Sequence, residues 1–159
     1  MLSQPPVRLG RDWIAAHVPH AGSMCLLDAV LDWGPGHVLC EADNHRRADH
    51  PLRQFGRLGA ACGLEYAAQA MAVHAALTAP PQEPAQARPG MLVSARALTL
   101  HVSRLDDVDA PLQVRAERLG AGPDMLLYEF GVHAGGRLLL GGRASILLGS
   151  APLTEPITR

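Results

Sequence analysis

A single carboxylate stands in a stretch of the chain that is otherwise apolar. The segment CGLEYAAQAMAVHAAL, residues 62–77, has the pattern of a helix that is apolar on nearly every side, yet it carries Glu65 near its start and Gln69 one turn later. A buried carboxylic acid keeps its proton more readily, because desolvation disfavours the charged form, and it can then act as a proton donor. The alternative is a structural Glu65 that pairs with an arginine or caps a neighbouring segment. Gln69 would either orient the carboxylate or satisfy a polar group of the core.

Histidines supply the candidate bases, because neutral imidazole, with its ordinary pKa of about 6.5, accepts a proton at physiological pH. His20 follows a proline in the N-terminal segment, and His50 lies in a charged loop before the helix. Each is a candidate base or an ordinary loop histidine. His74 falls on roughly the same helix stripe as Glu65, where packing is the expected role. We expect the other histidines considered to face solvent (His17, His45) or to be structural (His101, His133).

Composition and motifs exclude several other kinds of chemistry. All fourteen cationic side chains are arginine, so Schiff-base and P-loop lysine chemistry are excluded. The sequence has no C-x-x-C, H-E-x-x-H or G-x-S-x-G motif and no glycine-rich phosphate loop, so we expect neither a metal nor a cofactor. The formal net charge is −1 and the charges are scattered, so no nucleic-acid or membrane partner is expected.

The cysteines and the apolar runs bear on the compartment. Cys25, Cys40 and Cys62 are odd in number and lie in apolar surroundings, which favours reduced thiols over a disulfide framework. The N-terminus lacks the apolar core of a signal peptide, and no apolar run reaches the roughly 18 residues of a membrane-spanning helix. These features predict a cytoplasmic protein.

The elements that would carry these side chains follow from the apolar patterning. Residues 58–79 run without proline and predict one long helix, which ends before the loop PPQEPAQARPG. Strand patterns occupy two stretches before it and four after it: 24–34, 37–45, 91–105, 111–120, 125–135 and 137–149. A helix that is apolar on nearly every side must be wrapped, and an antiparallel sheet is available to wrap it.

We therefore predict an α+β, hotdog-like fold, with a long central helix wrapped by a curved antiparallel sheet of five to seven strands. The length of the chain, with 48% apolar residues, favours a single domain over residues 1–159. Within it we expect an N-terminal arm over residues 1–20 and a mobile linker over residues 80–90.

Two blocks of the sequence resemble the hydroxyacyl-(acyl carrier protein) dehydratases of the hotdog superfamily. PHAGSMCLLDAV, residues 19–30, is similar to the family's Pro-His loop, and LEYAAQAMA, residues 64–72, is similar to its Leu-Glu-x-x-Ala-Gln-Ala on the central helix. The form GLEYAAQAMAVHAAL looks most like the divergent branch found with the dehydratases of aryl polyene pigment clusters. The resemblance implies that Glu65 is the catalytic acid.

The sequence departs from the family's main branch at the catalytic histidine. That branch has a Gly-His-Phe-Pro-Gly turn before the helix, whereas this chain has ADHPLRQFGRLG. His50 lies fifteen positions before Glu65, one residue further than usual for the family, and it lacks the flanking glycines. The divergent branch often lacks that histidine, and His20 of the Pro-His loop is then the natural substitute. Both His20 and His50 remain candidates.

The resemblance implies removal of water from 3-hydroxyacyl thioesters on acyl carrier protein, giving the trans-2-enoyl product in fatty acid or polyene biosynthesis. Such a reaction needs a base for the C2 proton and an acid for the departing hydroxyl. Unpaired N–H groups at the start of the helix, around Ala60 and Ala61, would bind the developing enolate oxygen, and Gln69 would assist in holding the substrate.

Two other functions remain open at this stage. A hotdog thioesterase could use Glu65 alone to activate water, and a weakly catalytic subunit could complete the acyl tunnel of a partner dehydratase. The resemblance implies paired hotdogs, either a homodimer or a heterodimer with a second hotdog subunit, in agreement with the edges and apolar surface that a single small sheet leaves uncovered.

Overall fold

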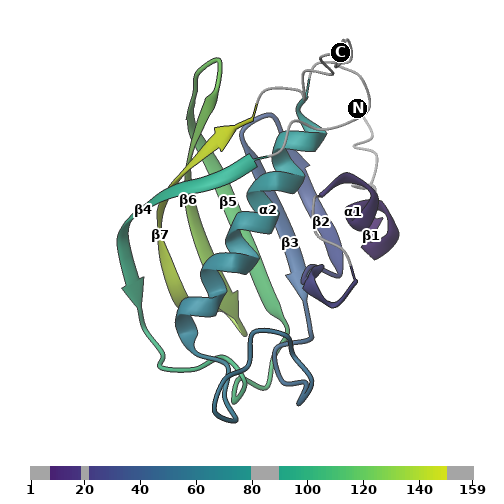
Figure 1. The fold of residues 1–159 in the computed structure, drawn as a ribbon, viewed down its shortest axis with the longest axis vertical. Coiled ribbons are helices and arrows are strands. Elements are labelled where there is room, and N and C mark those ends of the chain that lie inside the picture. Colours follow the sequence, from purple (N-terminus) through teal and green to yellow (C-terminus); the bar gives the residue numbers. More distant parts are fainter. Residues whose placement is uncertain (1–7, 19–21, 80–89, 150–159) are drawn as a thin grey trace, which may run out of the picture.

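The computed structural model describes residues 8–18, 22–79 and 90–149 of the chain. Seven strands form one antiparallel sheet in the order β1-β2-β3-β5-β6-β7-β4 (Figure 1). The strands are β1 (Leu9–Gly10), β2 (Ala29–Gly34), β3 (His37–Ala42), β4 (Gly90–Leu100), β5 (Leu112–Ala121), β6 (Met125–Ala134) and β7 (Arg137–Leu148). The helices are α1 (Arg11–His17) and α2 (Gly63–Leu77), with single 3₁₀ turns at Gly22–Met24 and Ala60–Cys62.

The long helix α2 lies along one face of the sheet, and the sheet curves around it (Figure 1). Alternation along the strands builds the core between them: in β6, Leu126, Tyr128, Phe130 and Val132 are buried, while the residues between them point to the other face. A Cβ on Gly63 would meet the side chain of Leu140 at 2.5 Å, so the helix begins with a residue small enough for it to pass close to β7. The predicted α+β hotdog arrangement is confirmed.

The central helix is shorter than the predicted 58–79. Its helical turns begin at Ala60, and the α-helix proper runs from Gly63 to Leu77. The backbone of Leu58 is instead hydrogen-bonded to residues 105 and 106, which lie far along the chain. Its N–H donates to Asp106 Oδ1 at 3.0 Å, and its carbonyl accepts from Leu105 N–H at 2.8 Å. The carbonyl of Leu58 is thus used by Leu105 and not by an N–H four residues further on, which agrees with the late start of the helix.

Three strand boundaries also differ from the prediction by several residues, and one of them is the end of the strand predicted for 37–45, which stops at Ala42. The strand predicted for 24–34, which is β2, starts at Ala29, because the chain before it forms a 3₁₀ turn and is then held by side chains of other elements. The strand predicted for 91–105 ends at Leu100 and gives way to bends that carry Leu105 back toward Leu58.

The predicted arm and linker lie partly outside the described residues. Within the arm, β1 and α1 are present, and β1 pairs with β2. Residues 1–7 and 19–21, which include His20, are outside the described ranges, as are residues 80–89 of the predicted linker. Residue 90, the last of that linker, opens β4.

Candidate functional site

The side chain of Gln69 joins the central helix to residues 24–26, the segment that follows the Pro-His block, through two hydrogen bonds. Its amide is fully buried, with Oε1 accepting from Leu26 N–H at 2.9 Å and Nε2 donating to the carbonyl of Met24 at 2.7 Å. Both ends of the amide therefore bind the main chain of residues 24–26. The expectation that Gln69 orients the carboxylate gives way to the other alternative, a polar side chain that satisfies buried groups of the core.

Asn44 and Arg11 also bind the main chain of this segment. Its Nδ2 donates to the carbonyl of Leu26 at 3.0 Å, and Arg11 Nη2 donates to the carbonyl of Cys25 at 2.9 Å. The side chains of Cys25 and Leu26 are buried in the core. Residues 24–26 are thus held by side chains of α2, of α1 and of the loop after β3, within six residues of His20.

Glu65 lies in the first turn of α2, one turn before Gln69 and on the same side of the helix. Its side chain is half-buried. Because Gln69 contacts Met24 and Leu26, the helix face that carries Glu65 is the face beside the segment from the Pro-His loop. The structure therefore brings Glu65 to the side of the helix that carries residues 24–26.

His50 is buried and belongs to a hydrogen-bonded relay. Its Nε2 lies 2.8 Å from the hydroxyl of Tyr66, and that hydroxyl donates to Asn44 Oδ1 at 2.6 Å. Its Nδ1 accepts from Leu52 N–H at 3.1 Å. An N–H donor at Nδ1 requires that this nitrogen be unprotonated, so the proton of the neutral ring sits on Nε2 and is donated to Tyr66.

The relay occupies both ring nitrogens of His50. Burial lowers the pKa of His50, which agrees with the neutral tautomer that the hydrogen bonds require. Burial raises the pKa of Tyr66, so its hydroxyl keeps the proton that it donates to Asn44. As placed, His50 has no lone pair left for a substrate proton, and its partner is Tyr66 rather than Glu65.

The start of the central helix differs from the expected enolate site. Ala60 is buried and its N–H donates to the carbonyl of Ser103 at 3.1 Å. That N–H is therefore not open to a substrate oxygen, which corrects the expectation for Ala60. Ala61 is exposed in the 3₁₀ turn that precedes α2.

The remaining histidines are partly as expected. His17 is exposed, and the buried His74 is held between Tyr128 and the carbonyl of Gly34, in agreement with a packing role. The expectation for His45 was wrong, because its ring is fully buried with Nε2 at 2.8 Å from the carbonyl of Val108. Its Nδ1 has no hydrogen-bond partner among the described residues.

Sequence reasoning missed Asn44 and Tyr66. Tyr66 carried a signal, since a phenolic hydroxyl on an apolar helix needs a hydrogen-bond partner when it is buried. Asn44 carried none, because its partners lie 18 and 22 residues away in the chain.

Other features bear on metals, thiols and membranes. Cys25, Cys40 and Cys62 are all free, as predicted, and burial raises the pKa of Cys40 to about 12. Over residues 8–18, 22–79 and 90–149, no group of three or more His, Cys, Asp or Glu is arranged to hold a metal ion. In the same ranges, the helices are too short or too polar to cross a membrane.

Solved structures share this fold. The dehydratase heterocomplex ApeI:P from Xenorhabdus doucetiae matches with a TM-score of 0.75 and 24% identity, over 86% of this chain and 91% of that one. Thioesterase superfamily member 2 of zebrafish matches with a TM-score of 0.58 and 17% identity, over 87% and 95%. A thioesterase from Haemophilus influenzae matches with a TM-score of 0.56 and 13% identity, over 81% of each chain. At these identities the likenesses establish the hotdog fold.

The sequence itself is assigned more narrowly. A comparison with curated proteins finds no match. Residues 13–152 match the ApeP-like family, described as ApeP dehydratase, and this range includes the Pro-His block, the relay and the whole of α2. The chain therefore belongs to the ApeP-like dehydratase family.

Proposed function

We propose that this chain removes water from 3-hydroxyacyl thioesters carried on acyl carrier protein, giving the trans-2-enoyl product in fatty acid or polyene-type biosynthesis. The observation that carries the proposal is the position of Glu65. It is a carboxylate on the central helix of a dehydratase-family fold, one turn from the glutamine that holds the chain leaving the Pro-His loop.

Glu65 is the proposed acid and His20 the proposed base. The base abstracts the C2 proton, and the carboxylic acid delivers a proton to the departing C3 hydroxyl, so water leaves and the double bond forms. His20 is preferred to His50 because the relay through Tyr66 uses both nitrogens of His50. The N–H of Ala61 is the remaining proposed contact for the thioester oxygen.

A second hotdog subunit is the proposed partner, and β4 is the proposed contact. β4 is an edge strand of eleven residues, and apart from two half-buried positions its residues are exposed on both faces. Its exposed apolar side chains include Met91 at 66%, Val93 at 46% and Leu100 at 46%. An exposed, long, apolar edge is a template for pairing with another strand. The heterocomplex ApeI:P gives a precedent for a partner subunit in a protein of this fold.

A thioesterase is the second candidate, and the two thioesterases that share the fold are the observation that favours it. In that case Glu65 would activate water against the thioester carbonyl, and no dedicated base would be needed. A third possibility is that the chain is a weakly catalytic subunit that acts only with its partner.

Product analysis separates these functions. The chain is incubated alone, and with a co-expressed hotdog partner, with a 3-hydroxyacyl thioester of acyl carrier protein, and the products are identified by mass spectrometry. An enoyl thioester supports dehydration, a free hydroxy acid supports hydrolysis, and turnover only with the partner supports the third possibility.

Substitutions then test the assigned residues. Glu65→Gln keeps the shape of the side chain, and we expect unchanged folding with turnover lowered by about 100-fold or more. His20→Ala is expected to give the same loss. If both variants turn over the thioester like the unmodified protein, the assignment of Glu65 and His20 fails.

A further inference from the structure

The outer face of the sheet, meaning the face turned away from α2, carries a row of charges across four neighbouring strands. The register places Glu117 of β5 opposite Glu129 of β6, Glu129 opposite Arg143 of β7, and Arg143 opposite Arg96 of β4. Read across the sheet, the row is minus, minus, plus, plus. The residues that flank it along these strands, such as Ala116, Phe130 and Ala144, point inward and are buried.

The row leaves charge unsatisfied within the chain. Like charges directly opposite each other on neighbouring strands are destabilising, and this row contains two such pairs. Glu129 and Arg143 approach to only 3.6 Å and are more than half exposed, while Glu117 is paired with Arg115 of the next row at 2.8 Å. Arg96 is exposed and makes no ion pair with any residue in the described ranges. Arg96, at one end of the row, would be stabilised by negative charge from outside, and the weakly held Glu129 and Arg143 are exposed enough to pair with a second molecule.

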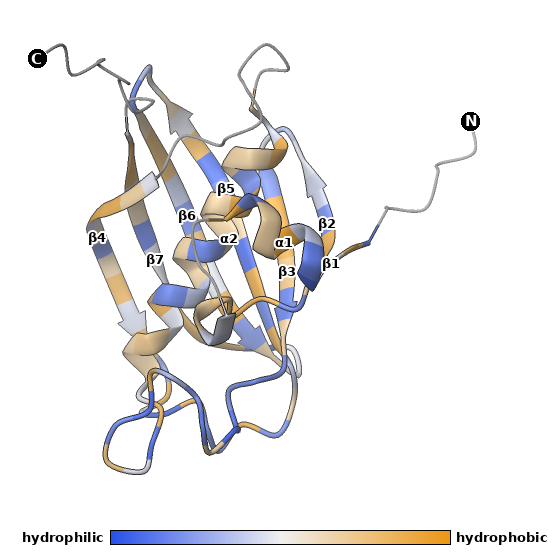
Figure 2. Cartoon of the chain, turned by 45° about the vertical axis from the view of Figure 1, so that its right-hand side comes forward, coloured by the Kyte–Doolittle hydropathy of each residue, from blue (hydrophilic) through white to orange (hydrophobic). Residues whose placement is uncertain are grey.

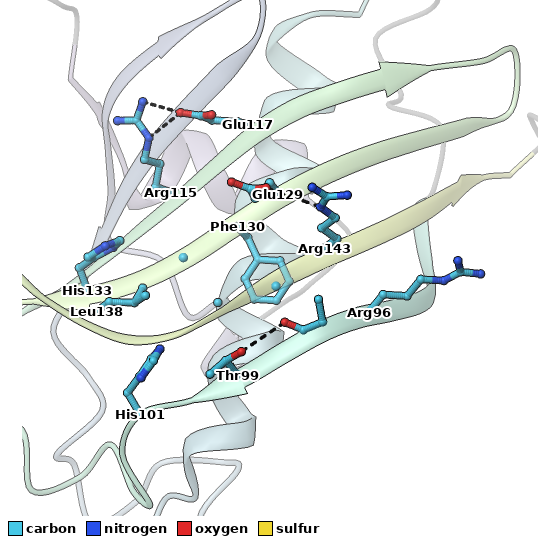
Figure 3. A pocket seen from close by; sticks show the side chains of 14 residues that line it. Arg96, Thr99, His101, Arg115, Glu117, Glu129, Phe130, His133, Leu138 and Arg143 are labelled. Carbon is cyan, nitrogen blue, oxygen red and sulfur yellow. Dashed lines mark hydrogen bonds and ion pairs between the residues drawn. The ribbon is translucent and has the colours of Figure 1, made fainter.

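Beside the row the face is hollowed rather than convex. Gly131 and Gly141 lie opposite each other and present no side chain, and the hollow over them has a volume of about 670 Å³ (Figure 3). The labelled side chains of Arg115, Glu129 and Arg143 stand along it on the side of the row, and His133 stands at the other side. Glycines within strands often mark places where another backbone approaches closely.

The row is complementary to itself under one symmetry operation. A two-fold axis that runs along the strands, midway between two facing sheets, reverses the order of strands and keeps position along them. Glu117 then faces Arg96 of the second copy, and Glu129 faces its Arg143. A two-fold axis across the strands would instead set each charge against its own kind. Facing sheets pack about 10 Å apart, a gap that one arginine and one glutamate can bridge together.

The same operation matches the apolar part of the face. Toward one end of the strands, Met91 and Met125 flank Leu147 in register, and their exposed fractions are 66%, 45% and 39%. Because the axis along the strands keeps position along them and exchanges β6 with β7, Met125 faces Leu147 of the other copy, and Leu147 faces its Met125. Self-recognition of one patch is the property of a two-fold interface.

We propose that the outer face of the sheet binds the outer face of a second copy of this chain, with Glu117–Arg96 and Glu129–Arg143 pairs formed between the copies. This contact uses outward-facing side chains of β4 and not the edge of that strand, and it lies on the face of the sheet away from α2 and Glu65. The face contact, the edge contact and the reaction can therefore each fail without the others.

Charge reversal tests the contact by sedimentation of the purified full-length chain. Arg143→Glu sets a glutamate against Glu129 of the other copy twice, once in each half of the interface. We expect association to weaken by about 100-fold or more, so that the assembly halves in mass. Glu129→Arg is expected to do the same, since it sets two arginines together.

Mixing the two variants is the decisive step. In a mixed pair, the glutamates at 129 and 143 of one copy face the arginines at 143 and 129 of the other. An equimolar mixture is therefore expected to recover the mass that each variant lost. Only a contact between copies produces this recovery, because the charges within each chain do not change on mixing.

Arg47→Glu is the matched control. It makes the same charge change at an exposed ion pair, with Asp49, in a loop outside the sheet, and it is expected to leave the mass unchanged. Circular dichroism verifies that all variants are folded. The proposal is overturned if the unmodified chain is a monomer at micromolar concentration, if the single reversals leave its mass unchanged, or if the mixture does not recover.

Discussion

Replacing His50 by alanine distinguishes a structural histidine from a catalytic base. The substitution removes the acceptor of Leu52 N–H and the donor to the Tyr66 hydroxyl from a site where the ring is only 5% exposed. Each buried group left unpaired costs about 1 to 3 kcal/mol. The Tyr66 hydroxyl still donates to Asn44, and Leu52 N–H is only partly buried, so we expect a loss of roughly 2 to 4 kcal/mol in unfolding free energy.

The loss is measured by urea denaturation and by the melting temperature. For a chain of this length, each 1 kcal/mol shifts the melting temperature by about 2 to 4 °C, so a decrease of roughly 5 to 15 °C is expected. Turnover of the remaining folded protein should fall by less than about tenfold, which is well short of the about 100-fold loss that removal of a general base causes.

Tyr66→Phe is the matched control. It keeps the ring but removes the hydroxyl, so the Nε2–H of His50 and the Oδ1 of Asn44 both lose their partner, and we expect a similar loss of stability. The double variant should lose less than the sum of the single variants, because the two residues share one hydrogen bond. If His50→Ala instead retains its stability and loses turnover by about 100-fold, the relay is not its role and His50 is the base.

Two further predictions concern stability and assembly. Hydrogen bonds and charge from Arg104, together with the hydrogen bond from Leu58 N–H, hold the pKa of Asp106 below its usual range. A depressed pKa contributes stability above the ordinary aspartate value of about 4 and loses it as the pH falls further. The Asp106→Asn variant should therefore be less stable than the unmodified protein at pH 7, and its stability should fall less as the pH is lowered. The measurement is the urea midpoint of both proteins at several pH values between neutral and acidic. If the midpoints of both proteins fall equally with pH, the prediction is contradicted. On β4, Val93→Lys should prevent binding of a second hotdog subunit, because a lysine on an edge strand opposes the addition of another strand. Binding is measured by co-purification. The control is Phe55→Lys, in the exposed hairpin outside the sheet, which should leave binding unchanged.

The sequence by itself determined the order of the central helix and the six longer strands, and the place of the helix carboxylate. Apolar periodicity is a property of neighbouring residues, so the alternation in 125–135 and the continuous apolar run around Glu65 were readable without the fold. Figure 2 shows the result, with polar and apolar residues alternating along the strands and the helix placed against the sheet. The resemblance in residues 19–30 and 64–72 predicted the same family that residues 13–152 match.

Only the tertiary structure decided what each polar side chain does. His45 was expected to face solvent but is buried against Val108, which is 63 positions away, and the N–H of Ala60 donates to the carbonyl of Ser103. The backbone of Leu58 pairs with Leu105 and with Asp106, and Asp106 lies 48 positions further along the chain. Hydrogen bonds between such distant positions form only when the strands and loops have been brought together, and no local pattern encodes them. For that reason the pattern located Glu65, while the partners of His50 and Gln69 became known only from the folded chain.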